Sequence, residues 1–408
     1  MKVRLKVFDS NKKASIPSYR WIILAIATWA QASATFVTYG ISPLSAIWQS
    51  EAGLTSTEVG LLLSSVQIGP ILSMLLVGKA LDQYGERLLI GLGSIFLGFT
   101  AFSIPFIQNY IGILFLLGAV GIWYGTAQPG GSKVVITWFE KQERGLAMGI
   151  RQAGIPIGGA LAGALIPYIS LHFGWQRAVY VQAILSILGG LLFLLMYRDP
   201  PKKLSKQKRK PYSFKEKLFM IMKNKQLLPL FITGVILVSL QMILVGHLMP
   251  YCINQLHLSV LRAGQALSVA LLFGMAGRVI LAWICDTFWG SHYRYSLQAS
   301  IWASILAVTV LVFIPPGTPI WFFMFLCAWL GFFGIGWFSS FLLAVTEHAS
   351  PGAEGLTVSY ALTLNQFAIV LAPVLFGLVV DWHSYRIAWV SLDVLLIIAA
   401  CLLGRRTS

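Results

Sequence analysis

The chain has 408 residues, of which 57% are hydrophobic and only 11% are charged, and its mean hydropathy is +0.77. A soluble domain carries roughly 25% charged residues, so the composition excludes an ordinary soluble protein. The net charge of +16 does not indicate nucleic-acid binding, because most Lys and Arg residues fall in the termini and in alternate loops on one side of a membrane. This positive-inside pattern predicts that both termini are cytoplasmic.

Apolar stretches that are long enough to cross about 30 Å of hydrocarbon recur along the whole chain. We predict an all-α membrane protein with twelve transmembrane helices. Their expected ranges are 21–48, 57–80, 88–107, 111–138, 145–170, 176–197, 228–254, 262–285, 294–314, 319–346, 355–380 and 386–404. The cysteines are scattered without a CxxC pair, so neither a disulfide framework nor a metal site is expected.

One long basic segment, 198–227, divides the predicted helices into six plus six. The chain is therefore expected to comprise a cytoplasmic tail (1–20), an N-terminal six-helix bundle (21–197), this cytoplasmic linker and a C-terminal six-helix bundle (228–404). The two bundles are expected to be pseudo-symmetric, because corresponding loops and helix starts in the two halves carry similar residues. Two such halves, with a substrate site between them at mid-depth, are what an alternating-access transporter needs.

A short motif follows the second predicted helix: Gly78, Asp82, Gly85 and Arg87 occur in the pattern Gly-x3-Asp-x2-Gly-x-Arg. A degraded copy that includes Asp286 follows the eighth helix. The motif resembles the loop motif of the major facilitator superfamily, except that the basic residue common after the aspartate is a glutamine here.

A second likeness to the same superfamily lies in the run 138–149, which contains Arg144 and resembles the link between helices 4 and 5. The resemblance covers essentially the whole chain and implies the twelve-helix fold, but it says almost nothing of the substrate. A helix N-terminus attracts an acid, so we interpret Asp82 as a latch on the inner gate, with a static loop carboxylate as the alternative. The residues assigned to gating are Gly78, Asp82, Arg87, Arg144 and Asp286.

Three basic residues, Lys133, Arg151 and Arg278, lie inside predicted helices, where a charge is costly and therefore usually functional. The acid expected at comparable depth is Asp393. This imbalance predicts a cavity for an anion, and arginine suits a carboxylate or phosphate through two parallel hydrogen bonds. Arg278 also resembles the helix-8 arginine of the oxalate/formate antiporter and monocarboxylate transporter families, in which that arginine binds the substrate carboxylate. The alternatives are extension of Lys133 to the membrane interface and contact of Arg151 with Glu143 or backbone carbonyls.

Polar residues inside the helices are further candidates for substrate contact, each with an inter-helix hydrogen bond as its alternative role. They are Tyr39, Gln67, Tyr124, Gln128, Gln152, Gln241, Asn365 and Gln366, of which Tyr39, Tyr124, Gln152, Asn365 and Gln366 are assigned to the substrate site together with the three basic residues. The candidates for proton coupling are Asp393 and His247, since histidine titrates near neutral pH. Their alternatives are a packing role for His247 and a structural pairing of Asp393 with Arg386.

We therefore expect a secondary active transporter that carries a small organic anion, a mono- or dicarboxylate, by proton symport or anion exchange. The alternative is an efflux antiporter for hydrophobic or cationic compounds, although a cation would need acids in the cavity. A non-transporting sensor of the same fold would carry an added soluble domain, which the sequence does not show. No enzyme activity, cofactor or metal is expected, because no phosphate loop, metal cluster or nucleophile elbow occurs. The expected partners are the substrate, protons and membrane lipids, for a monomer in a bacterial inner membrane.

Overall fold

The structure is a computed structural model that describes residues 16–139, 144–198, 221, 223, 224, 226–288, 292–350 and 354–404. Within these ranges the side chains at 16–18, 74–76, 78, 79, 82, 144–146, 286 and 354–356 are not described. The described residues are almost entirely helical and include no strand. They include eleven stretches that are long and apolar enough to cross a membrane, which confirms an all-α membrane protein.

The helices of the first half are α1 (Ile16–Ala52), α2 (Ser56–Phe102), the short 3-10 helix η1 (Ile104–Phe106), α3 (Tyr110–Tyr124), α4 (Ala127–Trp138), α5 (Arg144–Phe173) and α6 (Trp175–Met196). Those of the second half are α8 (Leu227–Asn254), α9 (Val260–Phe288), α10 (Tyr293–Phe313), α11 (Ile320–Gly334), α12 (Phe338–Glu347), α13 (Glu354–Trp382) and α14 (Tyr385–Gly404). The stretches α3–α4 and α11–α12 each count as one candidate span.

The helix boundaries differ from the sequence prediction at three places. The predicted helices 57–80 and 88–107 form the single element α2, which turns sharply at Gly85, where φ is 78°. Glycine adopts a positive φ without the steric cost that a side chain would bring. The span before residue 139 breaks after Gly125, and the span after residue 319 breaks at Ile335. Both were predicted as continuous because their apolar character continues across the break.

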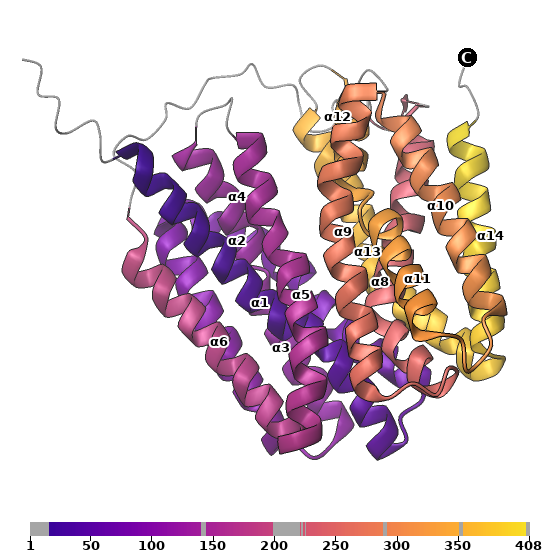
Figure 1. Ribbon diagram of the computed structural model, residues 1–408. Coiled ribbons are helices and arrows are strands. Elements are labelled where there is room, and N and C mark those ends of the chain that lie inside the picture. Colours follow the sequence, from indigo (N-terminus) through magenta and orange to yellow (C-terminus); the bar gives the residue numbers. More distant parts are fainter. Residues whose placement is uncertain are drawn as a thin grey trace, which may run out of the picture.

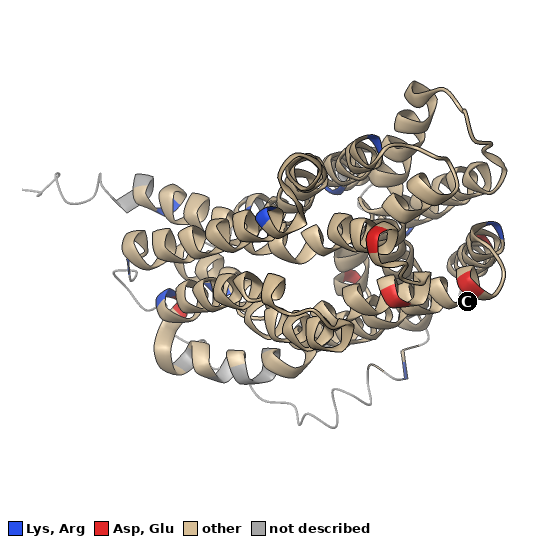
Figure 2. Ribbon diagram, turned by 90° about the horizontal axis from the view of Figure 1, so that it is seen from below, with Lys and Arg blue, Asp and Glu red and all other residues tan. Residues whose placement is uncertain are grey.

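The helices form two groups that lie side by side in Figure 1, with α1–α6 on one side and α8–α14 on the other. We call the end of the molecule at which α1 begins and α14 ends the terminal side, and the opposite end the far side. Three of the four buried apolar clusters lie within α1–α6, and the largest is built mainly from α8–α14. Seen end-on in Figure 2, charged residues are sparse along the helices.

The two groups touch through α2 with α13, α5 with α9, and α1 with α8. Every hydrogen bond recorded between described residues of the two groups lies near mid-depth or in the far-side halves of these helices. For example, the Ser268 hydroxyl donates to the Ala160 carbonyl at 2.8 Å, and the Asn254 amide donates to Gln49 at 3.2 Å. The structure is therefore closed at the far side.

Within the first group, α2 and α3 pack closely enough to require glycine. A Cβ added at Gly121 would overlap the backbone carbonyl of Val66, whereas one added at Gly118, a turn earlier on the same helix, would lie 3.8 Å from its nearest neighbour, the Ser65 carbonyl oxygen. We expect Gly121→Ala to lower the free energy of unfolding by about 1–3 kcal/mol through overpacking. Gly118→Ala is the matched control and should be neutral or slightly stabilising, because alanine favours helix more than glycine does. Thermal unfolding in detergent would compare them, and equal melting temperatures would contradict the packing described.

Candidate functional site

Arg151 on α5 is completely buried, and every recorded acceptor around its guanidinium is neutral. Its Nη2 donates to the side chain of Gln31 at 2.7 Å and to the Ala127 carbonyl at 2.8 Å. Its Nη1 donates to Gln128 at 3.1 Å and to Ser132 at 3.3 Å. Its Nε has no hydrogen-bond partner among the described residues. A buried cation solvated by dipoles alone keeps its positive potential for whatever anion comes near.

The network around Arg151 continues to the end of α3. The Gln31 amide donates to Thr35 at 3.1 Å and to the Tyr124 hydroxyl at 3.4 Å, and Thr35 and Tyr124 are themselves 3.4 Å apart. Four helices of the first group, α1, α3, α4 and α5, are thus joined around one guanidinium. The network also determines where the Tyr124 hydroxyl lies.

Arg278 on α9 is half-buried and faces the break between α11 and α12. A helix end leaves carbonyl groups without an intrahelical partner, and the Arg278 Nε donates to one of them, that of Ile335, at 3.5 Å. Its guanidinium also lies over the ring of Phe338, 5.2 Å from the ring centre. The hydrogen bond is at the weak limit of the usual geometry, and no other protein acceptor for this side chain is recorded among the described residues. Most of its N–H groups are therefore available to a ligand.

Arg278 lies where the two groups of helices meet. It is within electrostatic range of Tyr39 and Tyr124, both of which belong to the first group. Tyr39 is 7% exposed and lies against Gly159 of α5, with Gln241 of α8 nearby in the second group. The structure therefore brings together Arg278, Tyr39 and Tyr124 from both groups, with Arg151 linked to Tyr124 through Gln31.

Beyond Tyr39, toward the far side, the space between the groups is almost filled. A cavity of about 10 Å³ remains between residues of α1, α2, α8 and α13. It is lined by Thr38, Tyr39, Leu63, Gln67, Met242, Val245, Ile369 and Pro373. A cavity of that size has room for one water at most, so no substrate passes this point in the structure observed.

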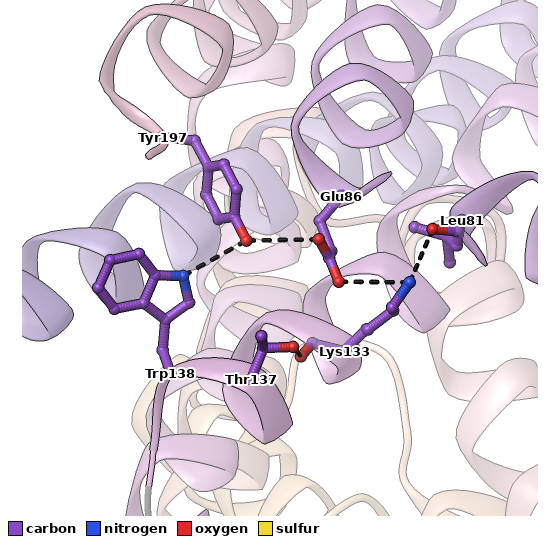
Figure 3. Close-up of polar contacts among 6 residues, drawn as sticks. All are labelled: Leu81, Glu86, Lys133, Thr137, Trp138 and Tyr197. Atoms are coloured by element: carbon purple, nitrogen blue, oxygen red, sulfur yellow. Dashed lines mark hydrogen bonds and ion pairs between the residues drawn. The ribbon is translucent and has the colours of Figure 1, made fainter. Parts of the chain in front are cut away.

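Lys133 lies apart from the two arginines, in a polar chain on the terminal side that Figure 3 shows. Its Nζ is 3.4 Å from the Glu86 carboxylate and donates to the Leu81 carbonyl at 2.7 Å. The Tyr197 hydroxyl donates to Glu86 at 3.5 Å, and Trp138 donates to Tyr197 at 3.3 Å. The expectation that Asp393 is the acid at this depth is therefore wrong, because Glu86 is a second one and is only 7% exposed. Glu86 directly follows Gly85 and falls between the predicted helices 57–80 and 88–107, so the sequence placed it in a loop.

The two candidates for proton coupling lie in separate packing contacts. His247 is fully buried; its Nε2 donates to the Pro373 carbonyl at 2.8 Å, and its ring is 5.0 Å from that of Phe376. Asp393 accepts a hydrogen bond from Thr309 at 2.6 Å, between α14 and α10. Arg386, the partner considered for Asp393, has its guanidinium over Phe313 instead, at 5.3 Å.

The remaining candidates are dispersed. Asn365 is 2% exposed, and both polar atoms of its amide lack a hydrogen-bond partner within the described part of the chain. Gln366 donates to the Gln67 carbonyl at 3.2 Å, Gln152 is half-buried on α5, and Arg87 donates to the Leu194 carbonyl at 2.7 Å. The gating side chains of Asp82, Arg144 and Asp286, together with position 78, lie outside the described residues.

Residues 25–373 match the family model described as Major Facilitator Superfamily. The chain belongs to this superfamily of membrane transporters, as the loop motif predicted, and it is a transporter and not an enzyme.

The relatives agree with this assignment. An uncharacterized MFS-type transporter of Mycobacterium tuberculosis is 26% identical over 373 residues, which are 91% of this chain and 81% of the relative. A protein of Bacillus subtilis named as a probable galactarate/D-glucarate transporter is 23% identical over 363 residues, covering 82% of this chain and 79% of the relative. Among solved structures, a bacterial homologue of the human lysosomal transporter Spinster, inward-facing and unoccupied, superposes with a TM-score of 0.80 at 16% identity and covers 94% of this chain and 96% of its own. That likeness shows the fold.

The ion pair of Lys133 with Glu86 should be coupled energetically. Replacing either side chain leaves the other partly buried without its ion-pair partner. We therefore expect Lys133→Met or Glu86→Gln alone to destabilise the protein by about 1–3 kcal/mol. The double variant should lose less than the sum of the two, since neither unpaired charge then remains. Thermal or denaturant unfolding in detergent measures the cycle. Strictly additive losses would show that the two side chains act independently.

Proposed function

We propose that this protein is a secondary active transporter that moves a small organic anion, a mono- or dicarboxylate, across the membrane by alternating access. One observation carries the proposal: Arg278 of the second group and the Arg151 network of the first meet at Tyr39 and Tyr124, with neutral partners around both guanidinium groups. One buried and one half-buried cation, with no acid recorded beside either among the described residues, favour an anionic substrate. The name of the Bacillus subtilis relative refers to galactarate and D-glucarate, which are dicarboxylates, and it supports the same class.

The finer architecture is part of this proposal. The arm of α2 from Ser56 to the turn at Gly85 would be a twelfth transmembrane helix, and α3–α4 and α11–α12 would each be one bent helix. The helices then divide into six-helix bundles at 21–197 and 228–404. The basic segment 198–227 would connect them on the cytoplasmic side, so that the terminal side faces the cytoplasm. A monomer in a bacterial inner membrane fits this arrangement.

The binding step follows from the donors that remain available. A carboxylate that enters from the terminal side would accept two parallel hydrogen bonds from Arg278, whose one hydrogen-bond acceptor within the described part of the chain is the Ile335 carbonyl. The hydroxyls of Tyr39 and Tyr124 would donate to the same anion from the opposite group. Arg151 would act at longer range, by adding positive potential and by holding Tyr124 through Gln31. An anion bound to both groups draws them together, which is the step that alternating access requires.

The other candidates have narrower roles in this proposal. Lys133 has an acid partner, so its position supports a part in holding the turn of α2 more than direct contact with the substrate. Proton symport through His247 or Asp393 and exchange of one anion for another both remain compatible with the proposal. An efflux antiporter for cations would need a negative centre near Tyr39 and Tyr124, where the charges recorded among the described residues are those of Arg278 and Arg151.

Binding measurements with Arg278 variants test the substrate class. We expect a carboxylate to raise the melting temperature of the purified protein, as a ligand does when it binds only the folded state. Arg278→Gln should weaken that binding by at least about thirtyfold, because a desolvated charge pair is lost. Arg262→Gln is the matched control, since this arginine begins the same helix but lies exposed at the far side.

The screen should include small carboxylates, phosphates and lipophilic cations. Stabilisation by a phosphate and not by a carboxylate would change the substrate class while keeping an anion. Stabilisation by lipophilic cations, unchanged in Arg278→Gln, would contradict the proposal and favour the efflux antiporter.

A further inference from the structure

Asp381, in the last turn of α13, bonds to the start of α2 in the other group. Its Oδ1 accepts from the backbone N–H of Ser56 at 2.8 Å, and its Oδ2 accepts from that of Thr57 at 2.7 Å. The Thr57 hydroxyl donates to the same oxygen at 2.5 Å. A carboxylate thus joins the two groups through three hydrogen bonds at the far side, where it also meets the positive end of a helix dipole.

The start of α2 is arranged so that these two N–H groups need an outside partner. Thr55 and Glu58 form a capping box, in which the Thr55 side chain accepts from the Glu58 N–H and the Glu58 carboxylate accepts from the Thr55 N–H. The first N–H groups of a helix have no intrahelical acceptor. The local cap leaves those of Ser56 and Thr57 without one, and Asp381 takes both.

The approach of the two helices also depends on a glycine one turn before the acid. A Cβ at Gly377 would overlap the Ser56 carbonyl oxygen, so a larger residue would push α13 away from α2. Gly377 and Asp381 stand in the pattern Gly-x3-Asp. The same pattern, Gly78-x3-Asp82, occurs near the end of the first arm of α2.

The two helices run in opposite directions, since the first arm of α2 leads from the far side to the terminal side and α13 leads back. Asp82 lies about as far along α2 from Ser56 as Asp381 lies along α13 from Glu354. Both helices therefore carry Gly-x3-Asp near their ends, and that end of α13 lies beside the start of α2. The hydrogen bonds recorded between their described residues reach inward as far as the one from Gln366 to the Gln67 carbonyl, near mid-depth.

We propose that Asp381 is the far-side latch of the transport cycle. Its three hydrogen bonds to the start of α2 hold the far side closed. Their loss lets α2 and α13 rock about the Gln67–Gln366 contact, so that the far side opens and the terminal side closes. The inference rests on the proposed alternating access, and it assigns the outward gate to a residue that makes no contact with Arg278 or the substrate.

The test measures distances in purified protein without substrate. In a background with the four cysteines replaced by alanine, spin labels at Glu51 and Gln255 report the far side by pulsed electron paramagnetic resonance. A second pair, at Arg198 and Glu347, reports the terminal side. We expect Asp381→Asn to raise the ratio of far-side-open to far-side-closed molecules by about tenfold, because the amide cannot accept all three hydrogen bonds. The terminal-side distance should shorten in the same molecules.

Two further variants make the result specific. Ser384→Ala removes a far-side hydrogen bond that stays within the second group, from the Ile387 N–H to the Ser384 hydroxyl at 3.3 Å, and it should leave both distance distributions unchanged. If Asp381→Asn reduces folding, Thr57→Val removes one donor only and should give a smaller shift of the same sign.

Distances in Asp381→Asn that match those in the native protein and in Ser384→Ala would overturn the latch. Because no substrate is present, these results are independent of the carboxylate assignment, which the Arg278 binding measurement tests separately.

Discussion

A guanidinium buried in a medium of low dielectric constant, without a carboxylate beside it, is the constraint on which the site depends. The Arg151 guanidinium donates hydrogen bonds to four neutral oxygens of α1 and α4, and each of these oxygens has to be oriented toward it. The Gln31 side-chain oxygen is oriented toward Arg151 because Thr35 and Tyr124 accept hydrogen bonds from its amide nitrogen. The positions of α1, α3, α4 and α5 around the centre of the first group are therefore coupled to the solvation of a single charge.

Arg278 shows the complementary solution in the second group. Instead of a shell of side chains it has a broken helix, and the break between α11 and α12 supplies a carbonyl and an aromatic face in place of a full set of acceptors. The first arginine is thus satisfied except at Nε, while the second is left with unused donors. This difference supports separate roles for the two arginines. Arg151 provides a constant positive potential, whereas Arg278 forms the direct contact with the anion and breaks it on release.

Much of the fold could be predicted from the sequence, because membrane spans are determined by long apolar runs that local composition reveals. The breaks at Gly125 and Ile335 could not, since apolar residues continue across them and only packing shows the turn. The grouping of the three cations was harder still. The sequence predicted Lys133 and Arg151 at a similar depth and assigned both to one substrate site. Depth says nothing of the rotation of each helix about its axis, which directs Lys133 to Glu86 instead.

Asp381 illustrates the same limit and a missed signal. It lies just past the predicted helix 355–380, and its partners are more than 300 positions away in the chain. The repeated Gly-x3-Asp pattern at the ends of two helices was nevertheless visible in the sequence. A pattern search restricted to corresponding helices of the two halves overlooks it, because α2 and α13 do not correspond to each other in the two halves.

The capping box at the start of α2 has a consequence for the speed of the transport cycle. Thr55 and Glu58 belong to the same turn, so their mutual hydrogen bonds persist whether or not α13 is in contact. When the far side opens, the helix gives up its outside acceptor to water but does not have to unwind its first turn and form it again. The motion can then be a movement of intact helices, limited by the breaking of a few exposed hydrogen bonds, and no slow local unfolding step need enter each turnover.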